Sequence, residues 1–214
     1  MKPFKLAFAL GAALLAAACL PVTSKTPVGT TVGLGADPAL IGTWKVIPDK
    51  RPDKRPDKRK DNAQDGNGPG FIHFILAKDG TITALTVSTG KAGDAAKTHG
   101  EWSVFAATTA QLGQNRILNV HETSENGEPS KDEDAQNIPV LYRFGRGGKL
   151  TLYLIDEKQA KAAIAAGKTE GTVEAGDYGD VTLTAPADKL DAFFASEDGA
   201  ALFKEELIAL KRVK

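Results

Sequence analysis

Ile41-Gly42-Thr43-Trp44-Lys45-Val46-Ile47 is the most informative stretch of the sequence. β-Branched and aromatic residues, which fit the pleated surface of a sheet, make up most of it. With its Gly-x-Trp opening, we interpret this run as the first strand of a small antiparallel barrel. The residues before it indicate export and a tether. Those after it include several β-prone runs that could close a barrel with it.

The composition fits one domain without a disulfide. A chain of 214 residues is long enough to bury a hydrophobic core of useful size. Its 27 basic and 27 acidic residues balance, so the overall charge gives no indication of a nucleic-acid partner. Cys19 is the single cysteine, which excludes an intrachain disulfide. The stability of the domain must therefore come from its core.

The first 19 residues are typical of an export signal. Two lysines precede an apolar run at 6–18 that is too short to span a bilayer comfortably, and three alanines precede Cys19. The segment resembles a bacterial lipoprotein signal, in which the cysteine is lipidated and becomes the first residue of the mature protein. Leu20, rather than an aspartate, follows the cysteine, which in Gram-negative lipoproteins implies the outer membrane. Ordinary signal cleavage is the alternative, because Ala16 stands where such signals commonly have leucine.

Two low-complexity segments flank the first strand. Residues 20–38 are rich in Thr, Gly and Pro without periodicity, which predicts a flexible tether. Residues 48–59 contain three copies of Pro-Asp-Lys-Arg, and the charged low-complexity loop that they open occupies 48–70. Proline in each copy excludes a helix or a central strand. The local positive charge would suit an anion, but aspartate in every copy dilutes it. We therefore favour a solvated loop over an anion-binding patch.

Turn residues between β-prone runs predict two hairpins. Asp79-Gly80 lies between runs at 71–76 and 81–87, and Asp-Gly is a strong signal for a tight turn between strands. A glycine-rich turn at 145–149 joins the second pair of strands. The remaining strands are expected at 101–106, 116–122, 140–144, 150–155, 181–184 and 207–213.

The last third of the chain carries helical signals. Asp156 can cap a helix that Gly167 ends. Pro186 suits the start of a second helix, whose apolar face includes Leu190 and Phe193. Residues 207–213 also fit a helix, but their alternation of apolar and polar side chains favours a strand.

Antiparallel strands that follow one another around a barrel place successive connections at opposite ends. The tight turns are expected at one end: Asp79-Gly80, Gly113-Gln114 and Gly147-Gly148. The long connections are expected at the other: 48–70, 90–100 and 123–137. That end would carry the cationic repeats beside the acidic residues of 125–134. We expect these oppositely charged loops to attract each other over the mouth of any cavity.

Several short motifs share one order with a known family. Gly42-Thr43-Trp44 is followed by Phe74 before Asp79-Gly80, by a second Gly-x-Trp at 100–102, and by Tyr142-x-Phe144 before Leu150-Thr151-Leu152. This order resembles the bacterial lipocalin-like domain, a calycin-type barrel often carried by envelope lipoproteins. The resemblance covers residues 41–155. It implies a single, mainly β domain at 39–214: an antiparallel barrel or half-barrel of about eight strands, with short helices in the C-terminal third.

The resemblance also implies a structural signature formed by Gly42, Trp44 and Arg212. In calycins the tryptophan closes one end of the barrel, and a basic residue of the last strand packs over it. A guanidinium can stack on an indole face while it donates hydrogen bonds to nearby carbonyls. The alternative is that Arg212 is a solvated residue near the C-terminus.

The sequence gives no signal for catalysis or for a metal. Its histidines, His73, His99 and His121, lack metal-ligand spacing with one another or with cysteine. Ser88-x-x-Lys91 matches the nucleophile motif of penicillin-recognising enzymes, but the partner motifs of those enzymes are absent. We expect neither enzyme activity nor a cofactor.

Together these observations predict an exported, lipid-anchored cell-envelope protein whose barrel binds a small or apolar ligand. The lipid on Cys19 would hold it at the outer membrane, facing the periplasm. Without the lipid, it would be periplasmic or secreted. The alternative function is a structural or interaction lipoprotein with a filled barrel and no ligand, because small barrels are often packed solid.

Overall fold

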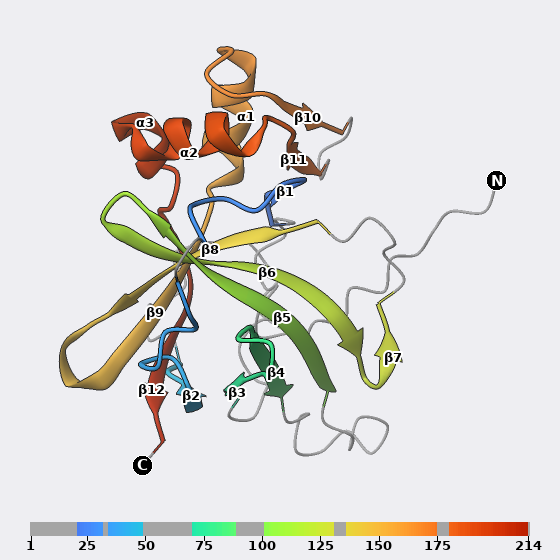
Figure 1. The fold of residues 1–214 in the computed structure, drawn as a ribbon, viewed down its shortest axis with the longest axis vertical. Helices are drawn as coiled ribbons and strands as arrows, with labels where there is room; N and C mark the ends of the chain where they lie inside the picture. Colours follow the sequence, from blue (N-terminus) through green and yellow to red (C-terminus); the bar gives the residue numbers. More distant parts are fainter. Residues whose placement is uncertain are drawn as a thin grey trace, which may run out of the picture.

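The computed structural model describes residues 21–31, 34–48, 70–88, 101–130, 136–174 and 180–213 (Figure 1). The predicted signal peptide with Cys19, the repeats from residue 49 onward, and His99 lie outside these residues. The described strands and helices are β1 (Thr23–Ser24), β2 (Gly42–Val46), β3 (Phe71–Leu76), β4 (Ile82–Ser88), β5 (Glu101–Leu112), β6 (Asn115–Glu125), β7 (Glu128–Pro129), β8 (Ile138–Phe144), the 3₁₀ turn η1 (Arg146–Gly148), β9 (Lys149–Leu154), α1 (Glu157–Ala165), β10 (Gly171–Val173), β11 (Val181–Leu183), α2 (Ala187–Ala195), α3 (Glu197–Ala200) and β12 (Glu205–Arg212).

Eight antiparallel strands form a closed barrel, in the order β2-β3-β4-β5-β6-β8-β9-β12. Pairing of β12 with β2 and of β5 with β6 completes the ring, and β7 adds an extra strand beside β6. The short helices lie in the C-terminal part of the chain, between β9 and β12. The predicted fold class is confirmed.

The connections alternate between the two ends, as the strand order predicts. We call the end with the tight β3–β4, β5–β6 and β8–β9 turns the turn end. The end with the long β2–β3, β4–β5 and β6–β8 connections is the loop end. The segment from β9 to β12, which contains the helices, also leaves the barrel from the loop end.

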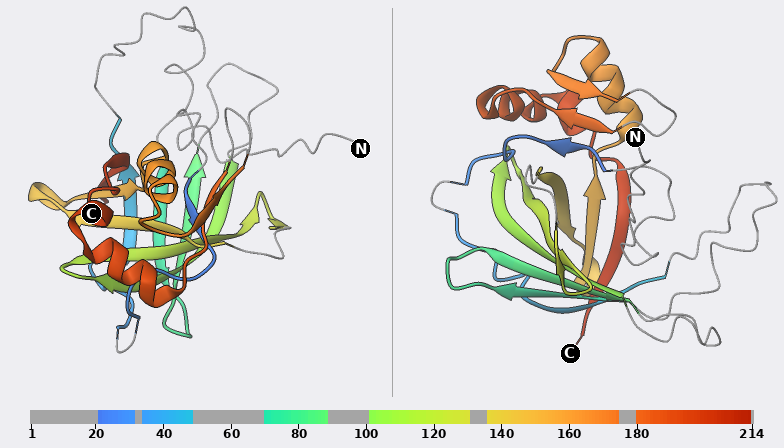
Figure 2. Two further views of the ribbon diagram at one scale, coloured as in Figure 1. Left: turned by 90° about the horizontal axis from the view of Figure 1, so that it is seen from above. Right: turned by 90° about the vertical axis from the view of Figure 1, so that its right-hand side faces the viewer.

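Two hydrophobic cores share one wall of the barrel. The inner core fills the barrel and includes Leu118 and Val140. The outer core includes the alternate residues Ile117 and Leu141 of the same strands, together with side chains of α1, α2 and β11. Helices and small sheet form a layer above the barrel (Figures 1 and 2). β6 and β8 are therefore buried on both faces where they lie between the two cores, which explains why adjacent residues such as Ile117 and Leu118 are both apolar.

The segment predicted as a flexible tether differs in the structure, where its described residues are packed. We call residues 21–31 and 34–41 the strap. β1 pairs in parallel with β11, and in Figure 2 it lies between the helical layer and the barrel. Val22 and Val28 are buried in the outer core, and Leu40 is buried in the inner core. These apolar side chains are too widely spaced to produce a periodic pattern, so the sequence did not reveal the packing.

Three other elements depart from expectation. β5 continues to Leu112 rather than ending at Ala106, because its last residues pack in the outer core. β6 continues to Glu125 and turns through Asn126-Gly127 into β7, where a polar loop was expected. β10 forms in a region for which no strand was predicted, paired with β11.

Candidate ligand-binding site at the loop end of the barrel

Four aliphatic side chains face the barrel interior near the loop end and are only partly buried. Each occupies an inner-face position of a different strand and packs against the inner core; they are Val46, Val120, Ile138 and Leu154. The register supports this direction, because directly paired residues of antiparallel strands share a face. Val120 pairs with the buried Ala107 and with Ile138, and Val46 pairs with the buried Leu210. Apolar surface therefore stays accessible inside this end of the wall.

Deeper in the barrel, large side chains fill the interior. Trp44, Phe74 and Tyr142 are buried in the inner core there, whereas the buried Phe105 lies nearer the loop end, across from Glu122. The edge of the Tyr142 ring meets Phe144, and Phe144 lies 6.2 Å from Trp44 between ring centroids. The turn-end half is thus packed with aromatic side chains, whereas the loop-end half is lined by Phe105 together with shorter aliphatic side chains.

Glutamates occupy inner-face positions around the loop end; we call them the acidic rim, and they are Glu101, Glu122, Glu125 and Glu205. Glu122 pairs with the buried Phe105, and Glu125 pairs with Ser103. Glu205 pairs with Leu154, and Glu101 with Ser88. No lysine or arginine stands at an inner-face position of the described strands at this end. The rim is therefore acidic above an apolar lining.

The carboxylates of Glu122 and Glu125 lie near each other and are partly buried. Oε1 of Glu122 and Oε1 of Glu125 are buried and have no hydrogen-bond partner among the described residues. Burial raises the pKa of Glu122, a hydrogen bond from Ser103 lowers it, and the nearby charge of Glu125 raises it again, so the pKa lies above its ordinary value. Burial also raises the pKa of Glu205, with Asp156 and Glu157 adding repulsion.

At the turn end, the structure brings Gly42, Trp44 and Arg212 together. The guanidinium carbon of Arg212 lies 4.5 Å from the centre of the Trp44 ring. Arg212 donates hydrogen bonds to the carbonyl oxygens of Ile41, at 2.8 Å, and of Ala39. Trp44 Nε1 donates to the carbonyl of Leu40 at 2.7 Å. Arg212 is exposed, but its head group is held rather than solvated freely.

A second polar cluster at this end was missed by the sequence reasoning. The carboxylate of Asp37 in the strap accepts hydrogen bonds from Tyr142, from Arg116 and from the Ala39 amide, each at 2.9 Å. Burial opposes the charge on Asp37, yet these three donors together lower its pKa below the ordinary value. No signal marked Asp37, because its partners come from strands about 80 and 105 residues later.

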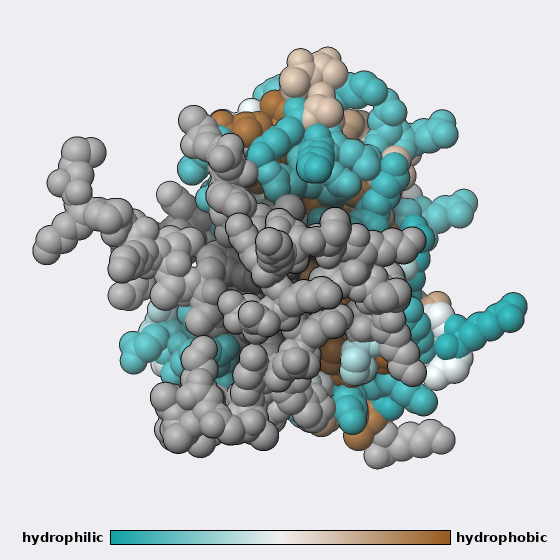
Figure 3. Space-filling view, turned by 180° about the vertical axis from the view of Figure 1, so that it is seen from behind, coloured by the Kyte–Doolittle hydropathy of each residue, from teal (hydrophilic) through white to brown (hydrophobic). Residues whose placement is uncertain are grey.

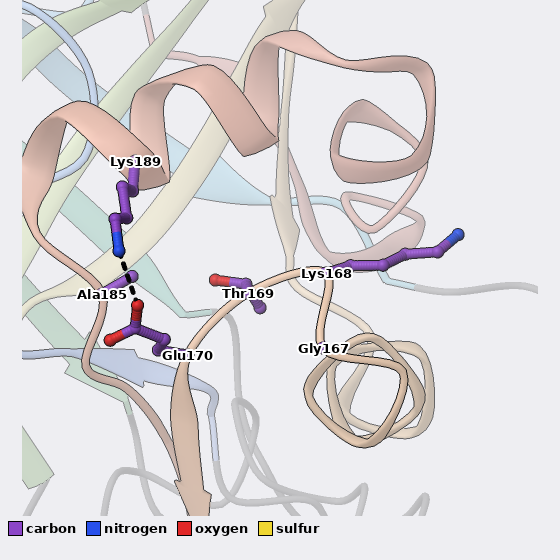
Figure 4. A pocket seen from close by; sticks show the side chains of 6 residues that line it. All are labelled: Gly167, Lys168, Thr169, Glu170, Ala185 and Lys189. Carbon is purple, nitrogen blue, oxygen red and sulfur yellow. Dashed lines mark hydrogen bonds and ion pairs between the residues drawn. The ribbon is translucent and has the colours of Figure 1, made fainter.

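The helical layer contains a separate pocket of about 180 Å³ (Figure 4). Its lining residues are Gly167, Lys168, Thr169, Glu170, Ala185 and Lys189. Lys189 pairs with Glu170 at 2.8 Å, and Lys168 pairs with Asp198 at 2.5 Å. The charges around this pocket thus neutralise one another, and on the face seen in Figure 3 this layer shows hydrophilic residues beside a few apolar ones.

The remaining candidates are scattered. His73 Nδ1 lies 3.0 Å from Thr43 Oγ1, and both His73 and His121 occupy outer-face positions of strands. Ser88 ends β4, while Lys91 lies outside the described residues, as does Cys19. Within the described ranges, no group of three or more His, Cys, Asp or Glu side chains is placed to hold a metal ion.

Among the described residues, no helix has the length and apolar character needed to cross a membrane. No protein-family model, no curated protein and no solved structure matches this chain, so the candidate site rests on its own geometry.

Proposed function

We propose that this chain is an exported, lipid-anchored cell-envelope protein with a lipocalin-like barrel that binds a small apolar ligand at its loop end. The sequence before and at Cys19 supports the anchor and an outer-membrane location facing the periplasm. The closed barrel supports the binding module, because an eight-stranded barrel is wide enough to hold one small ligand.

One observation carries the proposal: Val46, Val120, Ile138 and Leu154 keep exposed apolar surface inside the wall of the barrel. A ligand that covers this surface removes it from water, which contributes about 0.8 kcal/mol for each buried methylene. The aromatic side chains below would form the floor of the site. Binding of this kind is passive and needs no catalytic group.

Binding of an uncharged apolar fluorophore, N-phenyl-1-naphthylamine, tests the site. We expect its fluorescence to rise with the wild-type protein and Val120→Trp to abolish the rise, because the larger ring fills the loop-end lining. Val104→Trp is the matched control, since Val104 lies on the outer face of the neighbouring strand, paired with Leu85. Circular dichroism checks that both variants fold. Equal binding by both variants would move the site elsewhere.

The second candidate is a structural or interaction lipoprotein with no ligand, which the aromatic filling of the turn-end half favours. Native mass spectrometry of protein purified from its own envelope separates the two functions. A bound small molecule supports the binding module. The bare polypeptide mass, together with no fluorophore binding, supports the filled barrel.

A further inference from the structure

We propose that the ligand is a cationic amphiphile: an apolar body that lies in the barrel, and an ammonium or guanidinium head that the acidic rim binds. The inference rests on the proposed binding function and adds the chemical class of the ligand.

The acidic rim lies directly beside the apolar lining. Glu205 faces inward beside Leu154, and Glu122 lies directly across from Phe105. Acidic and apolar side chains are thus direct neighbours on the same inner face. A molecule that covers the lining must place its outer end among these carboxylates. An ammonium there is attracted, an alcohol is not, and a carboxylate is repelled.

Two buried oxygens of the rim have no hydrogen-bond donor among the described residues. Oε1 of Glu122 and Oε1 of Glu125 are buried without a hydrogen bond from any described residue. A buried acceptor without a donor is costly, and two adjacent carboxylates add repulsion. An ammonium head has three donors and a positive charge, so it can satisfy both oxygens at once.

A further polar group without a partner among the described residues lies inside the barrel. Thr109 is 4 % exposed, and it lies on the inner face, because it pairs with the inner-core residue Leu118. Its hydroxyl oxygen is buried and has no partner among the described residues. This polar side chain is independent of the rim. A ligand with a hydrogen-bonding group in its apolar body would satisfy it.

Competition with the fluorophore tests the charge preference. The probes are dodecylamine, dodecanol and dodecanoate, which share one chain length, used below their micellar concentrations at pH 7.5 with the full chain. We expect dodecylamine to bind at least ~10-fold more tightly than dodecanol, and dodecanoate to bind most weakly, because an opposite charge within a few ångströms of a partly buried carboxylate is worth a tenfold effect or more.

Substitution of the rim then tests its role. The double variant Glu122→Gln/Glu125→Gln should lose the preference for the amine and keep its affinity for dodecanol. The matched control is Glu206→Gln/Glu174→Gln, which changes the net charge equally. Glu206 lies on the outer face of β12, and Glu174 is exposed. The control should keep the preference.

The outcomes separate the two proposals. Equal binding of the amine and the alcohol, or tightest binding of dodecanoate, overturns the cationic ligand but leaves the binding module intact. A preference that survives in the rim variant also overturns it, since another group would then bind the head. No binding of any probe or of the fluorophore overturns both proposals.

Discussion

Trp44 and Arg212 come from opposite ends of the sequence and meet because β2 pairs with β12, with Arg212 directly across from Trp44. Gly42 completes this arrangement for a steric reason. A Cβ at Gly42 would lie 2.8 Å from Nη1 of Arg212, and the φ angle of +134° is one that other residues rarely adopt. The Gly-x-Trp motif therefore needs its glycine, because only glycine leaves room for the guanidinium that covers the tryptophan.

We expect Trp44→Ala to lower the free energy of unfolding by about 3–5 kcal/mol, because truncating a buried tryptophan leaves a large cavity. Arg212→Ala should have a smaller effect, since its head group is exposed. Chemical denaturation of both single variants and the double variant gives their coupling energy. A coupling near zero would show that the stacking contributes nothing to stability.

The acidic rim predicts a dependence of stability on pH. Since the folded-state pKa of Glu122 lies above its unfolded value near 4.5, folding binds a proton between these two values. The contribution of Glu122 to stability is therefore lost as pH rises through this window. Glu122→Gln should raise the melting temperature at pH 7, with the gain vanishing below about pH 4, where both states are protonated. Glu206→Gln, on the outer face, should show no such gain.

At the scale of the element, the strap is held by a side chain that imitates a neighbouring strand. The amide group of Asn119, which is buried, accepts a hydrogen bond from the Val28 amide and donates one to the Val28 carbonyl, both at 2.8 Å. Two residues later, Thr30 and Gln111 exchange backbone hydrogen bonds. The strap thus also pairs with the end of β5 that extends beyond its pairing with β4 at Ala107.

Asn119→Ala should destabilise the domain by roughly 2–4 kcal/mol, since it leaves a buried amide and a buried carbonyl without partners. Limited proteolysis should then cut the strap between residues 25 and 31 before the barrel is cut. Asn115→Ala is the control, because Asn115 is only half-buried and its side chain has no hydrogen-bond partner among the described residues. Equal protease resistance of the two variants would contradict a clamping role for Asn119.

Turns and helix caps could be predicted from the sequence, because the residues that form them are close together in the chain. Asp79-Gly80 makes its turn with a φ of +86° at the glycine, and Asp156 caps α1 by accepting a hydrogen bond from the Gln159 amide. Asn126-Gly127 offered the same kind of signal, and the φ angles of both residues are positive. The many polar residues around it led to the prediction of a loop there instead of a hairpin.

The acidic rim could not be predicted, because it depends on which glutamates point into the barrel. Their spacing along the sequence does not determine this. Register shifts between Val104 and Phe105 in β5 and between Glu206 and Ile208 in β12. The first brings Glu122 and Glu125, three residues apart, to the same inner face. Only the pairing of distant strands fixes such irregularities. The packing of the strap could not be predicted for a related reason. Val28 forms its hydrogen bond with Asn119, which lies 91 residues later in the sequence.

At the scale of the whole molecule, the proposed anchor predicts where the protein is found. Acyl chains on Cys19 would contribute about 0.8 kcal/mol for each buried methylene, so more than one chain holds a protein firmly on a membrane. Cys19→Ser should therefore release the protein into the soluble envelope fraction. Ala16→Leu, which restores the residue common in such signals, should keep it in the membrane fraction. A Cys19→Ser protein that stays on membranes after a high-salt wash would mean that lipid is not the anchor.

The packing of the strap also sets how far the molecule would stand from a bilayer. With the lipid on Cys19, Leu20 and Pro21 separate the anchor from Val22, which is buried in the outer core. Three residues span at most about 10 Å at full extension, only a little more than the roughly 5–7 Å thickness of one lipid headgroup layer. β1 and the small sheet that it joins would then lie close to the headgroups, because no long free linker would let the molecule move away from the membrane. An anchored copy would have a restricted orientation, and its reach would be limited to partners within the same lipid surface.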